Sequence, residues 1–208
     1  MIKITLPDGS VKEYASGVTP HEVALSISEG LARNVISASF NGTTIETATP
    51  LTTDGSLVLY TWNDAEGKKA FWHSTSHVMA QALEEKFPGI KLTIGPAIEN
   101  GFYYDVDFGD KRITDADFKD IEDRILTIAK EKHEFKMRSA SKAEALELYK
   151  DNEYKTELIT NLEDGTISFC DHSTFTDLCR GGHIPNTGII KAMKILSVAG
   201  AYWRGDEK

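Results

Sequence analysis

The sequence predicts an α+β protein with a small, strand-rich first part and a larger, two-layer α/β second part. In the first part, apolar and polar residues alternate in short runs separated by turn dipeptides, which is typical of strands and hairpins. In the second part, longer runs carry apolar residues at helical spacing. A polar, glycine-containing stretch at residues 63–69 separates the two patterns. We therefore expect two domains, at residues 1–62 and 63–208, which a chain of 208 residues is long enough to form.

The small part begins with a strand hairpin and a helix. Ile2, Ile4 and Leu6 alternate with polar neighbours, and Asp8-Gly9 supplies a tight turn before the pattern resumes. Thr19-Pro20 then opens a helix, because proline fits the first helical turn and the apolar residues that follow share one face, Val23, Ala24 and Ile27.

A second hairpin and a last strand complete the small part. Asn41-Gly42 is a turn dipeptide between two expected strands, Val35–Phe40 and Thr43–Glu46, and the strand Leu57–Tyr60 follows. The order β-β-α-β-β in a mixed sheet is typical of a β-grasp (ubiquitin-like) fold. Only a lone histidine, His21, stands near the helix start, so we expect an adaptor or docking module without catalytic residues.

The second part alternates helices with short strands. We expect a helix over Ala70–Phe87, which stops before a Pro-Gly dipeptide, and a strand-rich region over Leu92–Phe108. A helix with one apolar and one charged, solvated face follows over Asp115–His133, and His133 at its C-terminus has the structural role of complementing the helix dipole. A further helix over Ser141–Lys150 begins with a capping pattern.

Composition and charge exclude several classes of protein. A formal net charge of -9 argues against a polycation that coats nucleic acid by charge alone, although a local basic patch stays compatible with it. No apolar stretch approaches the ~18 residues of a membrane span, and the N-terminus lacks the layout of a signal peptide. Two cysteines, Cys170 and Cys179, are too few for a disulfide-dense secreted scaffold. We expect a cytoplasmic protein with reduced thiols and no membrane partner.

His73 and His77 are the first pair of residues that could carry chemistry. They stand four apart on an expected helix, so their imidazoles lie about 40° apart and one turn along, and can converge on one ligand. The pair lies at the margin of the apolar arc of that helix, where a pocket-lining residue is expected. Taken alone, the spacing fits two hydrogen-bonded histidines beside a core equally well.

A second pair, Cys179 and His183, is also four apart, but Gly181-Gly182 between them favours an open loop over a helix. By residue type, the two pairs together are a tetrahedral ligand set for zinc. The same groups suit hydrolysis, because a neutral histidine can take a proton from water and loop N–H groups can hold an oxyanion. The spacing points to a metal or a hydrolytic site and does not choose between them.

Three other polar residues are weaker candidates. Lys155 and Asp177, each taken alone, are expected on the surface, where such residues usually lie. His172 stands close to the glycine loop in sequence, but no partner spacing supports it as a site residue.

Four blocks of the sequence together resemble one enzyme family. HSTSHVMAQAL, IGPAIENGFYYDVDF, FTDLCRGGHIPNT and AYWRGDEK stand in the order and spacing of the N-terminal half of bacterial threonyl-tRNA synthetases. Residues 1–62 resemble the TGS domain of that family, and the remainder resembles its editing domain, which alanyl-tRNA synthetases share. The resemblance implies a fragment that ends where the class II ligase core would begin.

The resemblance also implies a proofreading reaction. In the family, serine is sometimes charged onto tRNA(Thr), and the editing domain hydrolyses that ester by attack of water. Serine and threonine differ by one methyl group, worth ~1–3 kcal/mol in a pocket, so a first site cannot reject serine well enough by binding alone. A second pocket that is too tight for the threonine methyl completes the selection, and hydrolysis of an activated ester needs no ATP.

Site residues follow from the matching positions. The HxxxH motif of the family matches His73 and His77, and its CxxxH motif matches Cys179 and His183. By this resemblance the four are catalytic residues, and we expect Cys179 and His183 to form the end of the site that holds the substrate.

Two further blocks supply a lysine and an aspartate. Lys155 matches the lysine of an N-x-Y-K block, and Asp177 matches the aspartate of a DLC block. The resemblance implies that Lys155, together with His73, positions or activates water, and that Asp177 orients one of these side chains.

The substrate pocket is expected around Tyr104, Gly95 and Arg180. One departure from the family concerns the loop, because many relatives have proline where this chain has Gly182. We expect this departure to loosen the loop.

Metal use stays open in the resemblance. In alanyl relatives the equivalent motifs bind zinc, whereas hydrolysis in bacterial threonyl enzymes is thought to proceed without it. We favour a site that requires no cofactor and keep zinc at the HxxxH and CxxxH residues as the alternative. ATP is expected only in the ligase core.

The implied partners are tRNA(Thr) and the 3′ end of seryl-tRNA, with a homodimer formed through the ligase core and a monomeric fragment. A local tRNA contact is compatible with the charge, because from Cys179 onward the basic residues Arg180, Lys191, Lys194, Arg204 and Lys208 outnumber the acids Asp206 and Glu207. Two other functions stay open: a non-catalytic tRNA-binding or regulatory fragment, and a zinc-binding hydrolase module.

Overall fold

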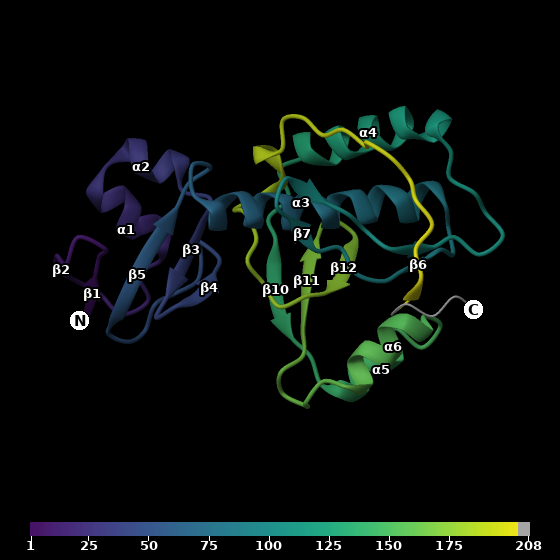
Figure 1. Cartoon of the computed structure of the whole chain (residues 1–208). Helices are drawn as coiled ribbons and strands as arrows, with labels where there is room; N and C mark the ends of the chain where they lie inside the picture. The colour runs from purple at the N-terminus through teal and green to yellow at the C-terminus, as the bar shows by residue number, and fades with distance from the viewer. Residues whose placement is uncertain (204–208) are drawn as a thin grey trace.

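A long helix joins a small part and a larger part of the chain in the computed structural model (Figure 1), which describes residues 1–203. Of the charged residues counted toward the C-terminal basic excess, the basic residues Arg204 and Lys208 and the acids Asp206 and Glu207 lie outside the described residues. Among residues 1–203, no helix is both long and apolar enough to cross a membrane.

The small part is a mixed sheet covered by two short helices, in the order β1 (Ile2–Thr5), β2 (Val11–Tyr14), α1 (Pro20–Ile27), α2 (Glu29–Asn34), β3 (Ser37–Phe40), β4 (Thr43–Ile45) and β5 (Gly55–Tyr60). The strand order is β2-β1-β5-β3-β4. β1 and β5 run parallel, whereas β1 pairs with β2, and β3 with β4 and β5, in antiparallel fashion. The predicted β-grasp arrangement is confirmed, with β4 at the outer edge of the sheet.

Local chemistry explains the helices of the small part. Thr19 and Glu22 form a reciprocal capping box at the start of α1. Val23 and Ala24 on that helix are fully buried, and Val23 packs with apolar residues of the sheet, Ile2, Ile4 and Leu57. The sequence pattern did not predict α2, a short helix capped by Ser28.

Helix α3 (Ala65–Lys86) begins earlier than predicted, so most of the stretch expected to be a linker is helical. Thr61 and Asp64 form the turn before it, in which the Thr61 N–H donates to Asp64 Oδ2 over 2.7 Å. The first turn of α3 lies against that turn, since a Cβ on Gly67 would lie 1.9 Å from the Thr61 carbonyl oxygen. Only residues 61–64 lie between β5 and α3, so no long linker separates the two elements, and the domain boundary at residues 62/63 stays a prediction.

The region predicted to be rich in strands contains only two-residue strands, which pair as β6 with β9 and β7 with β8: β6 (Lys91–Leu92), β7 (Ala97–Ile98), β8 (Gly101–Phe102) and β9 (Val106–Asp107). The prediction of a strand-rich region is therefore confirmed in the number of strands, although each strand is only two residues long. Most of this segment is loop that runs beside α3, and that loop brings Gly95 and Tyr104 to the site described below.

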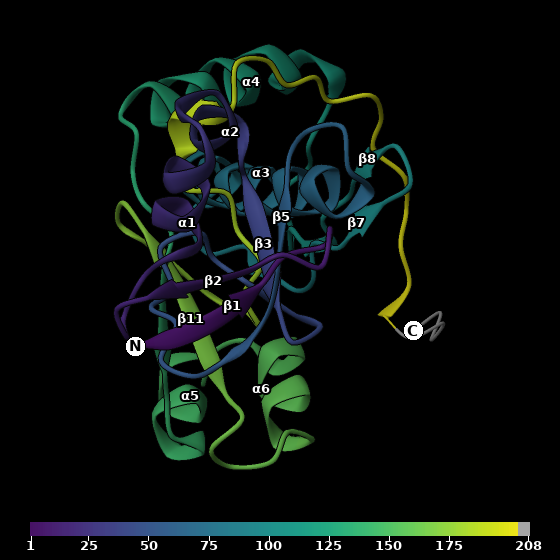
Figure 2. The same cartoon turned by 90° about the vertical axis from the view of Figure 1, so that its left-hand side faces the viewer.

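The remaining elements form two layers around a sheet: α4 (Asp115–Lys130), β10 (Lys136–Ser139), α5 (Lys142–Leu148), α6 (Glu153–Thr160), β11 (Ser168–His172), β12 (Phe175–Leu178) and the 3-10 turn η1 (Thr187–Ile189). The sheet order is β10-β11-β12. Neighbouring residues of β11 face opposite sides, because Phe169 packs with α5 and α6 whereas Cys170 packs with the α3 and α4 core. Figure 2 shows α4 and the pair α5 and α6 at opposite ends of the molecule.

The structure corrects the predicted end of one helix and confirms the predicted start of another. α4 ends at Lys130, so His133 follows the helix instead of ending it, and its Nε2 lies 2.6 Å from Glu131 Oε2. Ser141 caps α5 as predicted, accepting from the Glu144 N–H over 3.2 Å. After η1 the chain crosses α4 and reaches α6 (Figure 1), where the Trp203 indole N–H donates to Glu157 Oε2 over 2.8 Å.

Candidate active site

Helix α3 presents His73 and His77 toward the sheet and uses the residues between them to hold two loops. The Ser74 hydroxyl donates to the Ala70 carbonyl oxygen and accepts from the Ile184 N–H. The Ser76 hydroxyl donates to the Gly95 carbonyl oxygen over 2.9 Å. Hydroxyl residues are weak helix formers, so the serines of HSTSH are better explained by these loop contacts than by helix propensity.

The predicted open loop between Cys179 and His183 follows β12 directly. Gly181 and Gly182 have φ of +100° and +90°, a left-handed conformation that favours glycine. The Gly182 N–H donates to Glu46 Oε1 over 2.9 Å, a bond that proline could not make. The contacts of Gly182 thus fasten the loop to the small part.

Four side chains from the two motifs meet, as the sequence predicted for a shared site. The Cys179 Sγ lies 3.1 Å from His73 Nε2 and 3.3 Å from His183 Nε2. The Nε2 atoms of His73 and His77 are 3.4 Å apart. One donor atom from each of the four residues lies within 4.8 Å of all the others.

A carboxylate stands behind two of the three histidines. His77 Nδ1 lies 3.0 Å from Asp177 Oδ2, and His183 Nδ1 lies 3.1 Å from Glu46 Oε1. A carboxylate only accepts hydrogen bonds, so each Nδ1 carries a hydrogen and each Nε2 faces the centre of the cluster.

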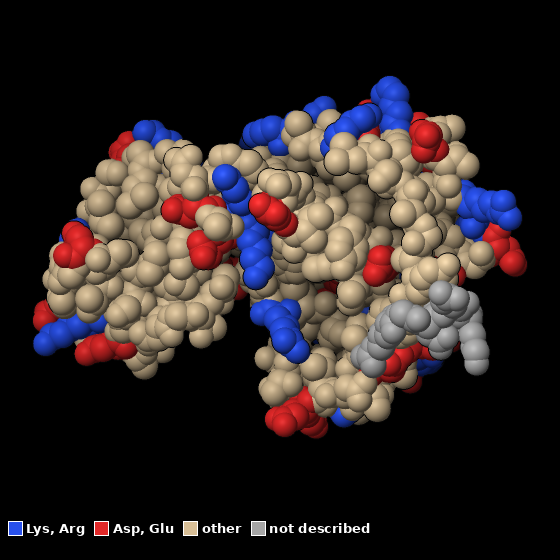
Figure 3. All heavy atoms as spheres, in the orientation of Figure 1, with Lys and Arg blue, Asp and Glu red and all other residues tan. Residues whose placement is uncertain are grey.

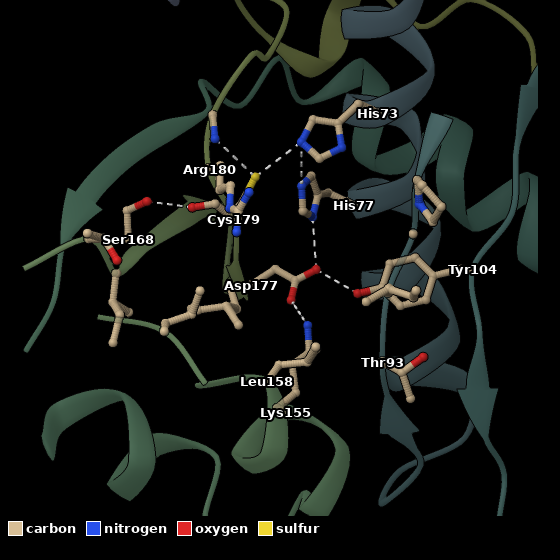
Figure 4. A pocket seen from close by; sticks show the side chains of 18 residues that line it. His73, His77, Thr93, Tyr104, Lys155, Leu158, Ser168, Asp177, Cys179 and Arg180 are labelled. Atoms are coloured by element: carbon tan, nitrogen blue, oxygen red, sulfur yellow. Dashed lines mark hydrogen bonds and ion pairs between the residues drawn. The ribbon is translucent and has the colours of Figure 1, made fainter. Parts of the chain in front are cut away.

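Asp177 is the hub of a buried polar network that also holds Lys155 and Tyr104 (Figure 4). Lys155 Nζ forms an ion pair with Asp177 Oδ1, and the Tyr104 hydroxyl donates to Asp177 Oδ2 over 2.6 Å. Lys155 and Asp177 are 2% and 3% exposed, so the expectation that each lies on the surface is wrong. The two opposite charges neutralise each other in an ion pair, and this allows both side chains to be buried.

Burial and hydrogen bonding act in opposite directions on the pKa values of Cys179 and His77. Burial opposes the thiolate of Cys179, yet hydrogen bonds from His183, His73 and His77 outweigh it and lower the pKa of Cys179 to about 3. Burial opposes the imidazolium of His77, but hydrogen bonds to Asp177 and Cys179 raise the pKa of His77 to about 9. The Cys179 sulfur is therefore a thiolate at neutral pH.

His73 differs from the other histidines of the cluster. Burial is the main cause that lowers the pKa of His73 below its ordinary value of 6.5. In His183, burial is outweighed by Cys179 and Glu46, and the pKa is raised. His73 is therefore the histidine of the cluster that stays neutral most readily.

The four donors fit a zinc ion. Zn–N and Zn–S bonds of about 2.0–2.3 Å place neighbouring ligand atoms of a tetrahedral site about 3.3–3.6 Å apart. Three of the six donor pairs lie close to this range, at 3.1–3.4 Å, and all four donors lie within 4.8 Å of one another. Carboxylates behind ligating histidines are also the usual outer contacts of zinc sites. The donors would be Nε2 of His73, His77 and His183, and Sγ of Cys179.

A cavity of about 490 Å³ opens beside this network. Its wall includes His73, His77, Lys155, Asp177 and Cys179, together with the three residues expected to line the substrate pocket, Tyr104, Gly95 and Arg180. Apolar side chains also line the cavity, Ile94, Leu158, Leu162, Ile167 and Leu178, and so do the hydroxyl residues Thr93, Thr166 and Ser168. His183 is fully buried behind Cys179 and is not among the lining residues.

Near the cluster lie one residue that the sequence did not indicate, Glu46, and one that it did not favour as a site residue, His172. Glu46 belongs to the part in which no catalytic residue was expected, and no spacing pattern links it to His183, 137 positions away. His172 is buried between Phe135 and Phe175, and within residues 1–203 neither of its ring nitrogens has a hydrogen-bond partner. Burial lowers the pKa of His172 to about 3, so its ring is neutral.

Two family models match the chain. One describes the TGS domain and covers residues 2–61. The other describes the threonyl and alanyl tRNA synthetase second additional domain and covers residues 167–208. The second match contains Asp177, Cys179 and His183.

Curated relatives match along the whole chain. It is 83% identical over 208 residues to a threonine–tRNA ligase of Flavobacterium johnsoniae, 55% over 210 residues to one of Cytophaga hutchinsonii, and 50% over 208 residues to one of Desulfatibacillum aliphaticivorans. In each case all of this chain is covered but only 32–33% of the relative, so the chain spans about a third of the length of these ligases. The chain thus carries matches to the TGS domain and to the threonyl and alanyl tRNA synthetase second additional domain, and over its whole length it is similar to a part of threonine–tRNA ligases.

Proposed function

We propose that this chain hydrolyses the ester of mischarged seryl-tRNA(Thr), as a post-transfer editing module. The observation that supports the proposal best is the convergence of His73, Lys155, Asp177 and Cys179 on the wall of one cavity. Together they combine a neutral imidazole, a buried ion pair and a thiolate in the space where an ester would lie. These groups suit hydrolysis of an activated ester, which needs positioning, proton transfer and charge stabilisation but no ATP.

His73 is the proposed acceptor of the proton from the attacking water. Its Nε2 faces the Cys179 thiolate and donates to it, which leaves Nδ1 to accept a proton. Its lowered pKa keeps the ring in the neutral form that a general base requires. Lys155, held by Asp177 at the cavity wall, is the proposed donor that orients the water or the ester oxygen.

The Cys179 end of the cavity is the proposed site for the amino group of the substrate. A seryl ester carries an α-ammonium group, and a thiolate fixed by two imidazoles is a complementary anion. This arrangement uses Cys179 for binding and orientation, so no acyl-enzyme intermediate is required. Selectivity against threonine would come from a wall that leaves no room for one more methyl, worth ~1–3 kcal/mol.

The proposed partner is tRNA(Thr), of which the module contacts the 3′ end. On the face shown in Figure 3, Lys and Arg side chains gather along the side of the larger part that borders the groove between the two parts. This local excess supports a phosphate contact despite the net charge of -9.

A zinc-containing site is the second candidate, because the four residue types are zinc ligands and one donor atom from each lies within 4.8 Å of all the others. Zinc held by all four residues would have no open position for water, as in structural sites. It would fix the cluster, and the proton would still be taken by a group outside it. Elemental analysis of protein purified without chelators or added metal distinguishes the candidates: one zinc per chain supports the second, and zinc-free protein that hydrolyses the ester excludes a required metal.

Hydrolysis of seryl-tRNA(Thr) by the wild-type chain and its His73→Ala and Lys155→Ala variants tests the proposal. We expect each variant to lose at least about 100-fold in rate, as is usual when a general acid–base group is removed. His21→Ala is the matched control, since His21 lies at the start of α1 in the small part. Retained tRNA binding without hydrolysis by the wild-type chain would instead identify a non-catalytic tRNA-binding module.

A further inference from the structure

Glu46 contacts three groups of the glycine loop from the opposite side of the cluster. Its Oε1 accepts from the Gly182 N–H over 2.9 Å and from the His183 N–H over 3.4 Å. The same oxygen lies 3.1 Å from His183 Nδ1. One carboxylate oxygen therefore holds both the backbone of the loop and the ring of its histidine.

The small part fixes the position of this carboxylate. Glu46 follows β4, the edge strand of the β-grasp sheet, and its carbonyl oxygen accepts from the Thr49 N–H in a tight turn. The next carbonyl oxygen, that of Thr47, accepts from the His21 N–H at the start of α1. Glu46 is thus anchored on the fold of the small part and does not belong to a free loop.

The two parts are in van der Waals contact at this point. A Cβ on Gly181 would lie 3.2 Å from Glu46 Oε1, and one on Gly182 would lie 3.3 Å from the Thr44 methyl carbon. The glycines thus let the loop approach β4 closely enough for the three hydrogen bonds to form.

His183 in turn contacts two residues of the proposed catalytic site, Cys179 and His73. Its Nε2 lies 3.3 Å from the Cys179 sulfur, and its ring stacks on His73 with centroids 4.9 Å apart. A histidine whose Nδ1–H is held by a carboxylate has a fixed tautomer and a fixed ring orientation. The carboxylate thereby determines which nitrogen of His183 faces Cys179.

We propose that Glu46 is a positioning residue of the editing site, supplied by the β-grasp part, that holds the Nδ1–H of His183 and the Gly181–Gly182 loop in place. The β-grasp part is then a component of the site and more than a docking module beside it. This inference rests on the proposed function for its effect on rate, but the contact it describes can be tested without any substrate.

The test compares Glu46→Ala and Glu46→Gln with the wild-type 208-residue chain. Glutamine keeps an oxygen that can accept from both backbone N–H groups and from Nδ1, so it is the conservative variant. Glu13→Ala is the control, because Glu13 is an exposed glutamate on β2 of the same part. Far-UV circular dichroism and urea unfolding show that each variant folds.

The first readout is the ring ¹H–¹⁵N spectrum of His183, assigned with His183→Gln. We expect a slowly exchanging Nδ1–H resonance in the wild-type chain, its loss in Glu46→Ala, and its retention in Glu46→Gln and Glu13→Ala. A His183 spectrum that is the same in Glu46→Ala and wild type would overturn the proposal.

The second readout separates kcat from KM for seryl-tRNA(Thr) hydrolysis. Loss of a group that orients an active-site histidine lowers activity about 10- to 100-fold, so we expect Glu46→Ala to lose this factor in kcat with little change in KM, and Glu46→Gln to recover most of it. A lower kcat with an unchanged His183 spectrum contradicts positioning through His183. If the wild-type chain has no hydrolytic activity, the proposed function fails, and the spectrum alone decides whether Glu46 holds His183.

Discussion

Asp177 receives hydrogen bonds from three elements that are distant in sequence. His77 comes from α3, Lys155 from α6 and Tyr104 from the loop after β8, and all three end on its two carboxylate oxygens. The Lys155 ammonium and His77 outweigh the effect of burial and hold the pKa of Asp177 well below its usual range. Removing this one negative charge therefore leaves the buried Lys155 ammonium without its counter-charge and removes an acceptor from the network.

Asp177→Asn should destabilise the fold and abolish hydrolysis together. Breaking a buried ion pair by removing one partner costs ~3–5 kcal/mol, and we expect a loss of this size in the free energy of unfolding in urea near neutral pH. Because the pKa of Asp177 is lowered, its contribution is present above the ordinary value of 3.8 and is lost as the pH falls through its folded value. Asp110→Asn, at an exposed position, is the control and should change stability by less than about 0.5 kcal/mol. Equal stabilities for the two variants would contradict the central position of Asp177.

Cys179 should be a thiolate in the folded chain at neutral pH. Its pKa is lowered to about 3, so thiolate absorbance at 240 nm should persist on acidification until the pH falls through that value or the chain unfolds. Unfolding in urea at neutral pH should abolish the absorbance, because an ordinary cysteine has a pKa near 9.0. Cys179→Ser should lack the signal and Cys170→Ser should keep it, since burial raises the pKa of Cys170. Loss of the thiolate signal in Cys170→Ser would show that Cys170 carries the anion, and it would contradict this prediction.

At the scale of elements, the features with local spacing could be predicted from the sequence. The HxxxH pair lies on one helix, and Gly181-Gly182 favours an open loop, so the sequence alone predicts both pairs. The first turn of α3 was missed because its polar, glycine-containing sequence is typical of a linker. Its helical state depends on packing against Thr61, which no local pattern reports.

Helix α6 shows why the rest of the site was harder to predict. The helix is short, and its sequence does not show that Lys155 is buried, because burial depends on an aspartate 22 positions later. Only the family resemblance selected Lys155 and Asp177, whereas Glu46 was selected neither by pattern nor by resemblance. The positions of these three residues depend on contacts between distant segments, which the local sequence pattern does not report.

Gly95→Ala tests how the loop between β6 and β7 supports the pocket. A Cβ on Gly95 would lie 2.3 Å from Cδ2 of Tyr104, so the Tyr104 ring must move and its bond to Asp177 is weakened. Overpacking of this kind costs ~1–3 kcal/mol, and hydrolysis should fall with it.

Because of this clash, we expect the effects of Gly95→Ala and Tyr104→Ala on the free energy of unfolding not to be additive. Gly95→Ala should destabilise the Tyr104→Ala chain much less than the wild-type chain, as measured by urea unfolding. Gly30→Ala is the control, because the nearest atom to its Cβ would be Ser28 Oγ at 3.9 Å, and this helical position should be stabilised by ~0.5–1 kcal/mol. Full additivity of the Gly95 and Tyr104 substitutions would contradict the steric explanation.

At the scale of the whole molecule, the two parts meet at the site itself. α3 begins directly after the small part and carries His73 and His77, while Glu46, the residue after β4 of the small part, holds the glycine loop. The sequence predicted the fold of each part, because each has its own hydrophobic pattern. It did not predict that the first part contributes a side chain to the second.

Hydrolysis of two matched substrates by the unmodified 208-residue chain tests the central claim most directly. The measurement is the single-turnover rate for seryl-tRNA(Thr) and for threonyl-tRNA(Thr) at equal, saturating enzyme concentration. We expect the seryl ester to be hydrolysed about 10- to 200-fold faster, the selectivity that one methyl group can provide, and His73→Ala to lose this hydrolysis. Equal rates for the two esters, or a seryl-tRNA half-life that the chain does not shorten, would contradict the assignment of this cavity as an editing site.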